Sequence, residues 1–520
     1  MATINLTAHF SNLSFWPGRL LEDPGATVIV TQTATEFRFR YTTGDFANYR
    51  IVVTGTDFTY VDGVPTGGTM TSVRILNPAG QTVISFNNLA AGTLASDLSQ
   101  FFANVFGTQS GEGPGPQNWI AWTFLMSGND VINGTAGDDR QGLVGTDPGN
   151  DTYNMGAGND YIGGGSGNDT INGGAGWDHL SFGGTNWNDG TTAFRGATVN
   201  LVTGVVLDPW GGTDTITGIE EVQGSRFNDV IIGTAARDEF WGLRGADTLR
   251  GGAEADRVHY NRDYLGGGNR GVIVDLETAL VGGSIRGTIR DGFGNIDTVF
   301  DIEEVNGTRF NDVFVGSSAS NVFFGGEGVD SYVGEGGVKD EVSLNVWFGD
   351  TQPGNIRVDF RLASGQIIND GFGNTETMVG IEAIDSGPGN DTLIGNASAN
   401  ELRGGLGTDL MTGGGGNDTF EFLEGSGLGQ GDRITDFLAS GVAGNIDVLA
   451  FRVSEYTGLT GTLQLVNGTV ATQAGGTFVY NAANDTLFWD QDGTGAAAMV
   501  AVVILSNVAA LSAANFELYF

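Results

Sequence analysis

The feature that most constrains this chain is a nine-residue repeat in which Asp returns at a fixed position after a run of glycines. The full unit, Gly-Gly-x-Gly-x-Asp-x-apolar-x, is almost unbroken at residues 413–421. Four blocks of such units lie between residues 125 and 421, and almost every repeat Asp is followed two positions later by an apolar residue. A solvated acidic linker has no reason to keep this phase, so the pattern predicts ordered, repetitive structure.

Each part of the nonapeptide has a physical role. Glycines permit the positive φ angles of a tight turn and let carbonyl oxygens approach one another closely. The last three residues are expected to form a short strand whose apolar member points inward. Two nonapeptides then make one flattened coil of 18 residues, and coils stack by parallel strand pairing at about 4.8 Å. The pattern predicts an all-β parallel β-roll, with Asp151 over Asp169 and Asp391 over Asp409.

The repeat aspartates are the candidate metal ligands. Stacked carboxylates repel, but together with turn carbonyls they form an all-oxygen cage, which suits Ca²⁺ better than Mg²⁺. The composition also demands a cation, because 61 acidic residues against 23 basic ones give a formal charge of −38. We predict several bound calcium ions. The predicted ligands are Asp130, Asp139, Asp151, Asp160, Asp169, Asp178, Asp229, Asp238, Asp247, Asp256, Asp312, Asp330, Asp391, Asp409 and Asp418.

These nonapeptides resemble those of the RTX (repeats-in-toxin) proteins, and the resemblance extends over all four blocks. It implies a parallel β-roll, folding driven by extracellular calcium, and unfolded export from a Gram-negative bacterium through a type I secretion channel. We therefore expect the type I secretion machinery as a partner and the extracellular bacterial surface as the location.

A longer repeat is superimposed on the nonapeptides. The inserts between blocks share a Val-x-Val-Asp-Leu type of stretch followed by an Ile-Glu segment, and Glu220, Glu303 and Glu382 recur about every 80 residues. This indicates three tandem modules of one roll block plus one β-rich excursion. The adjacent glutamates would suit general acid–base catalysis. However, Ala383 takes the second place in the third copy, and tandem repetition favours a structural corner.

Both ends of the chain differ from the repeats. Residues 1–124 contain no nonapeptide. Within them, residues 36–41, 49–53 and 73–76 predict strands, Asp62-Gly63 predicts a hairpin connection, and the apolar spacing of residues 90–106 predicts one helix. We expect the chain to leave the roll after Asp418. The last hundred residues resemble the C-terminal region of serralysin-type proteases, which implies a β-rich cap that carries the secretion signal.

These observations divide the chain into six parts. They are residues 1–124, an N-terminal β-rich domain; 125–182, the first repeat block; 183–259, 260–342 and 343–421, each an insert plus a block; and 422–520, the C-terminal cap.

Several functional classes lack their defining residues. The chain has no cysteine, which excludes disulfides, zinc–thiolate sites and a catalytic thiol. Its three histidines, His9, His179 and His259, cannot form the His-Glu-x-x-His helix of a zinc protease, and no Gly-x-Ser-x-Gly elbow occurs. We expect His179 and His259 on the roll surface.

The sequence also argues against a nucleic-acid partner, a membrane span and a cleaved signal peptide. The scarcity of basic residues argues against a nucleic-acid partner. The longest apolar run, residues 496–505, is too short for a membrane span. The N-terminus also lacks the basic and apolar segments of a cleaved signal peptide.

Three functional classes remain open. The first, which we favour, is a non-enzymatic, calcium-folded structural protein that self-associates at the cell surface, such as an S-layer or extracellular matrix subunit. The second is a calcium-dependent adhesin or carbohydrate-binding protein whose N-terminal domain holds a surface polysaccharide. The third is a polysaccharide-active enzyme with an unrecognised site in that domain or in the inserts.

Overall fold

The computed structural model divides the chain into two compact units, residues 1–254 and 255–520. The described residues are 3–6, 27–33, 35–41, 50–61, 64–76, 82–87, 129, 131–134, 136–141, 149–183, 193–345, 354–423, 431–440 and 446–520. Both units are all-β in their described parts, apart from short 3₁₀ helices: η1 (Asp263–Gly266), η4 (Val453–Glu455) and η5 (Ala513–Asn515). The predicted fold class is confirmed. The helix predicted at residues 90–106 lies outside the described residues.

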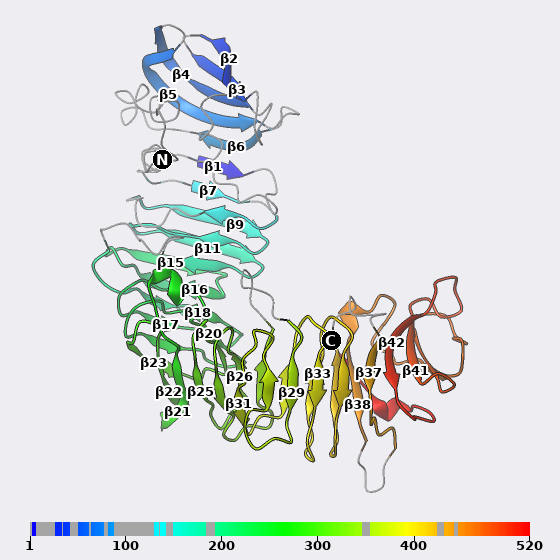
Figure 1. Cartoon of the computed structure of the whole chain (residues 1–520). Coiled ribbons are helices and arrows are strands. Elements are labelled where there is room, and N and C mark those ends of the chain that lie inside the picture. The colour runs from blue at the N-terminus through cyan, green and yellow to red at the C-terminus, as the bar shows by residue number, and fades with distance from the viewer. Residues whose placement is uncertain are drawn as a thin grey trace. The chain divides into compact units, whose positions relative to one another are not determined.

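The first unit begins with an antiparallel sheet (Figure 1). Its strands are β1 (Thr3–Leu6), β2 (Thr27–Gln32), β3 (Glu36–Tyr41), β4 (Arg50–Val61), β5 (Val64–Leu76) and β6 (Thr82–Asn87). Strands β4 and β5 pair up to Val61 and Val64, and the hairpin connection predicted at Asp62-Gly63 lies outside the described residues. Strand β1 pairs with β6 on one side and, in parallel, with β7 (Val131–Asn133) on the other. The antiparallel sheet is therefore continuous with one face of the roll.

The roll of the first unit has two parallel faces. One contains β7, β9 (Thr152–Ala157), β11 (Thr170–Ala175), β17 (Val230–Ile232) and β19 (Thr248–Arg250). The other contains β8 (Arg140–Gln141), β10 (Tyr161–Ile162), β12 (His179–Ser181), β16 (Glu221–Gln223) and β18 (Glu239–Trp241). Strand β9 pairs with β11 and β10 with β12 at an offset of 18 residues. This register confirms the predicted coil.

The second unit continues the same architecture. One face contains β25 (Val313–Val315), β27 (Ser331–Val333), β31 (Thr377–Val379), β33 (Thr392–Ile394), β35 (Leu410–Thr412) and β37 (Asp432–Ile434). The other contains β20 (Arg257–His259), β24 (Glu304–Asn306), β26 (Val322–Phe324), β28 (Glu341–Ser343), β32 (Ala383–Asp385), β34 (Glu401–Arg403), β36 (Thr419–Phe422), β38 (Val448–Arg452) and β43 (Phe516–Tyr519).

Each insert places antiparallel strands in one face of the roll. The insert strands are β13 (Thr198–Asn200), β14 (Val205–Leu207) and β15 (Thr213–Thr217); β21 (Ile273–Val281), β22 (Ser284–Arg290) and β23 (Ile296–Phe300); and β29 (Arg357–Asp359) and β30 (Ile367–Asn369). In the first insert the strand order is β11-β15-β14-β13-β17. The opposite face stacks directly from β12 to β16 to β18. The roll is therefore continuous past this insert.

The roll extends beyond Asp418, contrary to our expectation. Strand β37 pairs in parallel with β35, and β38 pairs in parallel with β36. Strands β42 (Val500–Leu505) and β43 pair in parallel with β37 and β38 in turn. The nine-residue spacing is lost here because the connections are longer. The cap is completed by β39 (Leu465–Asn467), β40 (Thr477–Asn481) and β41 (Thr486–Asp490).

The core of the repeat blocks includes the apolar residues that follow the repeat aspartates by two positions. They are at most 1% exposed: Ile171, Leu180, Phe240, Leu249, Phe314, Tyr332, Leu393 and Phe420. Within the second unit the rings of Phe314 and Tyr332, one coil apart, stack with centroids 5.2 Å apart. The predicted inward position of the apolar residue is confirmed.

Candidate metal centres

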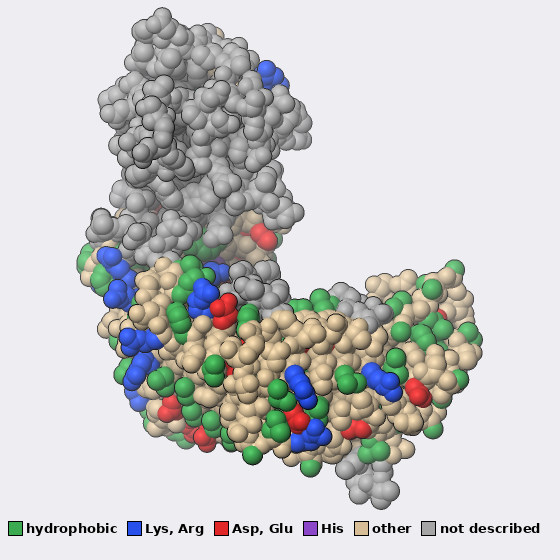
Figure 2. Space-filling view, in the orientation of Figure 1, with side chains coloured by type: hydrophobic (Ala, Val, Ile, Leu, Met, Phe, Trp, Pro, Cys, Tyr) green, Lys and Arg blue, Asp and Glu red, His purple; other side chains and the backbone are tan. Residues whose placement is uncertain are grey.

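The predicted ligands lie in buried turns at the starts of the roll strands. Asp130 lies outside the described residues, and every other predicted ligand is at most 4% exposed. Figure 2 accordingly shows no excess of acidic over basic side chains on the displayed part of the described surface, although the chain is strongly acidic. Because charged groups are rarely buried without a compensating partner, these carboxylates require an explanation.

One oxygen of many of these carboxylates is used by the fold itself. The main-chain N–H of Asp151 donates to Oδ1 of Asp169 over 2.7 Å, and that of Asp391 donates to Oδ1 of Asp409 over 2.8 Å. The same bond joins Asp139 to Asp160, Asp160 to Asp178, Asp229 to Asp247, and Asp312 to Asp330. The aspartates therefore form ladders in which each side chain binds the backbone of the preceding coil. The predicted stacking of residues 18 apart is present.

The second oxygen, Oδ2, is available for a cation in several of these turns. Among the described residues it is buried and has no hydrogen-bond partner in Asp160, Asp169, Asp178, Asp391 and Asp409. A buried carboxylate oxygen without a partner costs free energy. A hard cation such as Ca²⁺ compensates for this cost when it is bound.

The glycines bring further oxygens to the same place. A Cβ added to Gly404 would collide with Oδ2 of Asp409. A Cβ added to Gly407, whose φ is +140°, would collide with the carbonyl oxygen of Gly389 in the preceding coil. The glycines thus leave room for carboxylate and carbonyl oxygens of successive coils. Among the described residues no group of three Asp, Glu or His side chains is placed to hold a metal ion. Main-chain carbonyl oxygens such as that of Gly389 are available beside the carboxylates as further ligands. These residues fit calcium.

The electrostatics of the metal-free turns follow from their burial. Burial, together with the charges of Asp214, Asp151 and Asp208, raises the pKa of Asp169 to about 8, although the N–H of Asp151 opposes the rise. Burial likewise raises the pKa of Asp409 to about 8, with Asp432 and Asp391 adding to the effect. Without metal, these carboxyls hold their protons near neutral pH.

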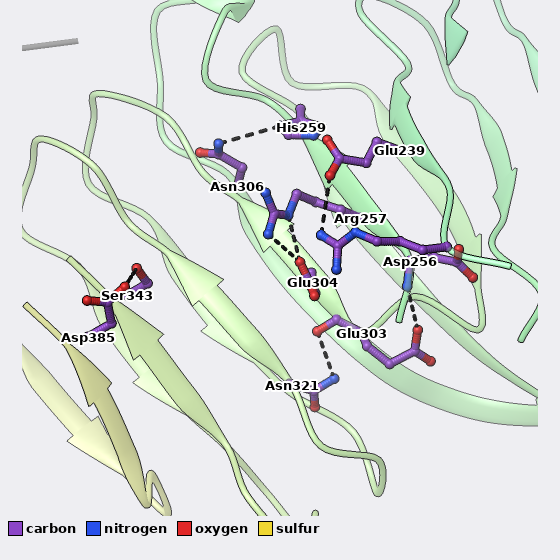
Figure 3. Close-up of polar contacts among 11 residues, drawn as sticks. Glu239, Asp256, Arg257, His259, Glu303, Glu304, Asn306, Asn321, Ser343 and Asp385 are labelled. Atoms are coloured by element: carbon purple, nitrogen blue, oxygen red, sulfur yellow. Dashed lines mark hydrogen bonds and ion pairs between the residues drawn. The ribbon is translucent and has the colours of Figure 1, made fainter. Parts of the chain in front are cut away.

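The three insert glutamates take positions in the ladders. Glu220, Glu303 and Glu382 accept the main-chain N–H of the repeat aspartates Asp178, Asp256 and Asp340 over 2.9, 3.1 and 3.1 Å. Figure 3 shows Glu303 between Asp256 and Asn321, whose side-chain amide donates to the carbonyl oxygen of Glu303. This contact gives each glutamate a structural role, because it carries a ladder across an insert.

Sequence reasoning missed several ladder members. Besides the three glutamates they are Asp214, Asp340, Glu376, Asp432 and Asp447, which accept a main-chain N–H from Asp169, Asn321, Asp330, Asp409 and Asp418. The three glutamates do keep the nine-residue spacing, because they lie nine residues before Asp229, Asp312 and Asp391, whereas the other five do not. All of them do keep the triplet acid-x-apolar, as in Asp432-Arg-Ile434, and that triplet could have identified them.

The prediction of surface histidines was wrong. His179 is 9% exposed and stacks on Tyr161 with ring centroids 4.6 Å apart, while its Nδ1 lies 3.0 Å from Glu221. His259 is 1% exposed. All three residues of β12 and of β20 are buried, so both sides of these strands are covered. The side chains of nearby strands, such as Tyr161 and Trp241 against His179, produce this burial.

A few comparisons with known proteins are informative. The sequence model of the RTX calcium-binding nonapeptide repeat matches residues 126–140, 146–162, 156–186, 223–258, 306–338 and 385–420. No curated protein sequence matches the chain. Among solved structures, the extracellular lipase LipA from Serratia marcescens is similar over 94% of this chain and 85% of that chain, with 13% identity and a TM-score of 0.21. That degree of likeness carries no information about function.

The described helices include none long and apolar enough to cross a membrane. The stretches that match the family model are those that contain the ladders. They hold the stacked aspartates and the glycines that approach the preceding coil closely. The nonapeptide blocks of this chain therefore belong to the RTX family of calcium-binding repeats.

Proposed function

We propose that this chain is a secreted, non-enzymatic structural protein of the bacterial cell surface, a subunit of an S-layer or extracellular matrix that folds on calcium and then self-associates. The observation that carries the proposal is the row of buried Oδ2 atoms, as in Asp391 and Asp409, which have no partner among the described residues. Such rows occur in the turns of both units. A chain built in this way devotes most of its described length to a calcium-dependent scaffold.

The residues of the roll explain why calcium is required. Oδ1 of each stacked aspartate holds the preceding coil, so these carboxylates cannot move away from one another without breaking the ladder. Calcium, when bound, supplies the positive charge that the buried Oδ2 atoms lack. Because metal that binds only the folded state stabilises it by mass action, the chain should fold where calcium is abundant.

Folding that depends on calcium is compatible with export of an unfolded chain through a type I channel, and we include this route of export in the proposal. The unfolded chain carries a net charge of −38, and its 88 glycines make ordering entropically costly. Cytoplasmic free calcium is low, so the chain stays extended there. Folding then follows export.

A calcium titration of metal-free full-length protein tests the proposal. Circular dichroism and light scattering are followed in the same cuvette, and the end point is viewed by electron microscopy. We expect the β signal to rise with calcium and then sheets or filaments to grow. An unchanged spectrum after exhaustive chelation would contradict calcium-driven folding. A calcium-folded protein that stays monomeric at micromolar concentration would contradict the lattice.

The two alternative functions give different results in binding and turnover assays. Saturable binding of a surface polysaccharide by the full-length protein, lost when residues 1–124 are deleted from a chain that still folds on calcium, would favour the adhesin. Turnover of polysaccharide would favour the enzyme. We expect neither.

A further inference from the structure

Each insert ends in a loop that carries two buried acids six residues apart. The pairs are Asp208 and Asp214, Asp291 and Asp297, and Asp370 and Glu376, all at most 1% exposed. The first acid of each pair organises its loop. Oδ1 of Asp208 accepts the main-chain N–H groups of Trp210, Gly211 and Gly212 over 2.8, 2.5 and 2.8 Å.

The same arrangement recurs in the other two loops. Asp291 accepts from Phe293, Gly294 and Asn295, and Asp370 accepts from Phe372 and Asn374. The three loops can therefore be compared position by position.

In the second and third inserts, protein donors hold the remaining oxygens. The side-chain amide of Asn295 donates to Oδ2 of Asp291 over 2.8 Å, and the hydroxyl of Tyr260 donates to Oδ2 of Asp297 over 2.8 Å.

In the third insert, Asn374 donates to Oδ2 of Asp370 over 2.8 Å. The hydroxyl of Tyr332 lies 3.4 Å from Oε2 of Glu376 and 3.4 Å from Oδ2 of Asp330, and its single proton can be donated to either oxygen. In both inserts, therefore, protein donors lie against the second oxygens of these acids.

The first insert lacks these donors. Gly212 stands where Asn295 and Asn374 stand in the other loops, and Ile171 stands where Tyr332 stands in the third. Oδ2 of Asp208 and Oδ2 of Asp214 are both buried, with no hydrogen-bond partner among the described residues.

The surrounding groups do not replace the missing donors. Oδ1 of Asp214 accepts the N–H of Asp169 over 2.9 Å, so its other oxygen is the one left over. Arg195 donates through Nε to the carbonyl oxygen of Asp208 over 3.0 Å, not to its carboxylate. The charge of Asp208 also helps to raise the pKa of Asp214, after the larger effect of burial. Asp208 and Asp214 thus interact electrostatically, and Arg195, which contacts the main chain of Asp208, forms no described hydrogen bond with either carboxylate.

A main-chain oxygen borders the same space. A Cβ added to Gly212 would lie 2.5 Å from Oδ2 of Asp208 and would collide with the carbonyl oxygen of Gly167. Because Gly212 has no Cβ, the space between the carbonyl oxygen of Gly167 and the carboxylate of Asp208 stays unfilled.

We propose that the loop of the first insert binds its own calcium ion through Asp208, Asp214 and the carbonyl oxygen of Gly167. Its two carboxylate ligands lie in residues 187–222, outside the stretches that match the repeat family, whereas Gly167 belongs to the matched stretch 156–186. The chemistry is that of a hard divalent cation among oxygen ligands, two of them carboxylates. The other two inserts contain protein donors in its place.

The test counts calcium ions on the full-length protein at saturating calcium, by native mass spectrometry. Asp208→Asn and Asp214→Asn each keep an oxygen for the main-chain N–H groups but replace the carboxylate by an amide. We expect each variant, and the double variant, to lose the same single ion. The matched control is Asp370→Asn, whose Oδ2 already has a protein donor and which should lose none.

Circular dichroism of each variant at saturating calcium shows that the roll has folded. Terbium luminescence excited through Trp210 gives a second readout, since Trp210 is close in sequence to the proposed ligand Asp208. We expect Trp210→Phe to remove more of this signal in the parent chain than in Asp208→Asn. A double variant that keeps every ion, or an equal loss in Asp370→Asn, would overturn the site. In either case, loss of an ion in Asp409→Asn would leave the proposed function intact.

Discussion

At the scale of single residues, the two oxygens of each stacked Asp have separate tasks. Oδ1 of Asp409 accepts the N–H of Asp391 and fixes the register of two coils, while Oδ2 of Asp409 is buried with no hydrogen-bond partner. The nearby glycines are equally specific. Gly407 is required because a side chain would occupy the position of a carbonyl oxygen, and not merely because the turn is tight.

This difference between glycines can be tested in one turn region. Gly407→Ala should destabilise the calcium-bound protein by about 1–3 kcal/mol or more, because its φ of +140° is unfavourable for Ala and the Cβ would meet the carbonyl of Gly389. Gly415→Ala is the control, since its nearest neighbour would be Ala397 Cα at 3.7 Å. Denaturant midpoints at saturating calcium measure both. Equal losses in the two variants would contradict the close-approach explanation.

The ladder also contains amides in place of carboxylates. Asn400 donates its main-chain N–H to Oδ1 of Asp418 over 2.9 Å, as a repeat Asp does, and its own Oδ1 accepts the N–H of Asn396. Asn400→Asp would replace the side-chain amide by a second carboxylate oxygen. We expect tighter calcium binding or one additional ion, measured by titration calorimetry on full-length protein. A weaker affinity with no gain in stoichiometry would show that the turn cannot serve as a site.

At the scale of elements, the inserts lengthen one face of the roll and leave the other face stacked. The antiparallel strands β13 and β14 add to the face that contains β11 and β17, while β12, β16 and β18 pair directly. Because the turn before β16 belongs to an insert, a glutamate fills the ladder position there. Glu220 reaches the N–H of Asp178 across 42 residues of sequence.

The glutamate contact gives a prediction for the third insert. Glu382→Ala leaves the buried N–H of Asp340 without its acceptor, which should cost about 1–3 kcal/mol. Glu382→Gln keeps an oxygen acceptor and should lose much less. Thermal unfolding at saturating calcium compares the two. If Gln were as harmful as Ala, the charge of Glu382 and not its hydrogen bond would stabilise the ladder.

The sequence predicted those parts of the fold that repeat at a fixed distance. The stacking of Asp391 on Asp409 and the burial of Leu393 follow from the 18-residue coil. Asp214 lies 45 residues from Asp169, and Asp432 lies 23 residues from Asp409, so no single period reveals that they are stacked. Those separations depend on the lengths of inserts that pair within themselves. The buried histidines were missed because their burial depends on packing between side-chain rows.

At the scale of the whole molecule, folding places many carboxylates out of water in a chain of formal charge −38. In the unfolded chain these groups titrate near pH 4. In the metal-free fold, burial raises the pKa of Asp160 to about 7 and those of Asp169 and Asp409 to about 8. Protons and calcium are therefore alternative ways of neutralising the same buried groups, and the stability of the fold must depend on both.

The direction of this dependence follows from the raised pKa values. The folded metal-free state binds protons more tightly than the unfolded state. The stability that these carboxyls contribute is therefore complete below about pH 4, their pKa in the unfolded chain. That stability is lost as the pH rises through 7 and 8, the folded pKa values of Asp160, Asp169 and Asp409. We expect metal-free protein to gain β signal when the pH is lowered from 8 to 5, as measured by circular dichroism.

Calcium should reverse this trend, because bound calcium requires ionised carboxylates. We expect calcium addition to release protons in a pH-stat at pH 5, where the metal-free chain is folded and its buried carboxyls are protonated, and to release far fewer at pH 9, where these groups are ionised in either state. The apparent calcium affinity should fall on acidification over the same range in which the metal-free fold gains stability. Binding without proton release at pH 5, or a metal-free fold that weakens from pH 8 to 5, would show that the buried ladders are not where calcium and protons compete.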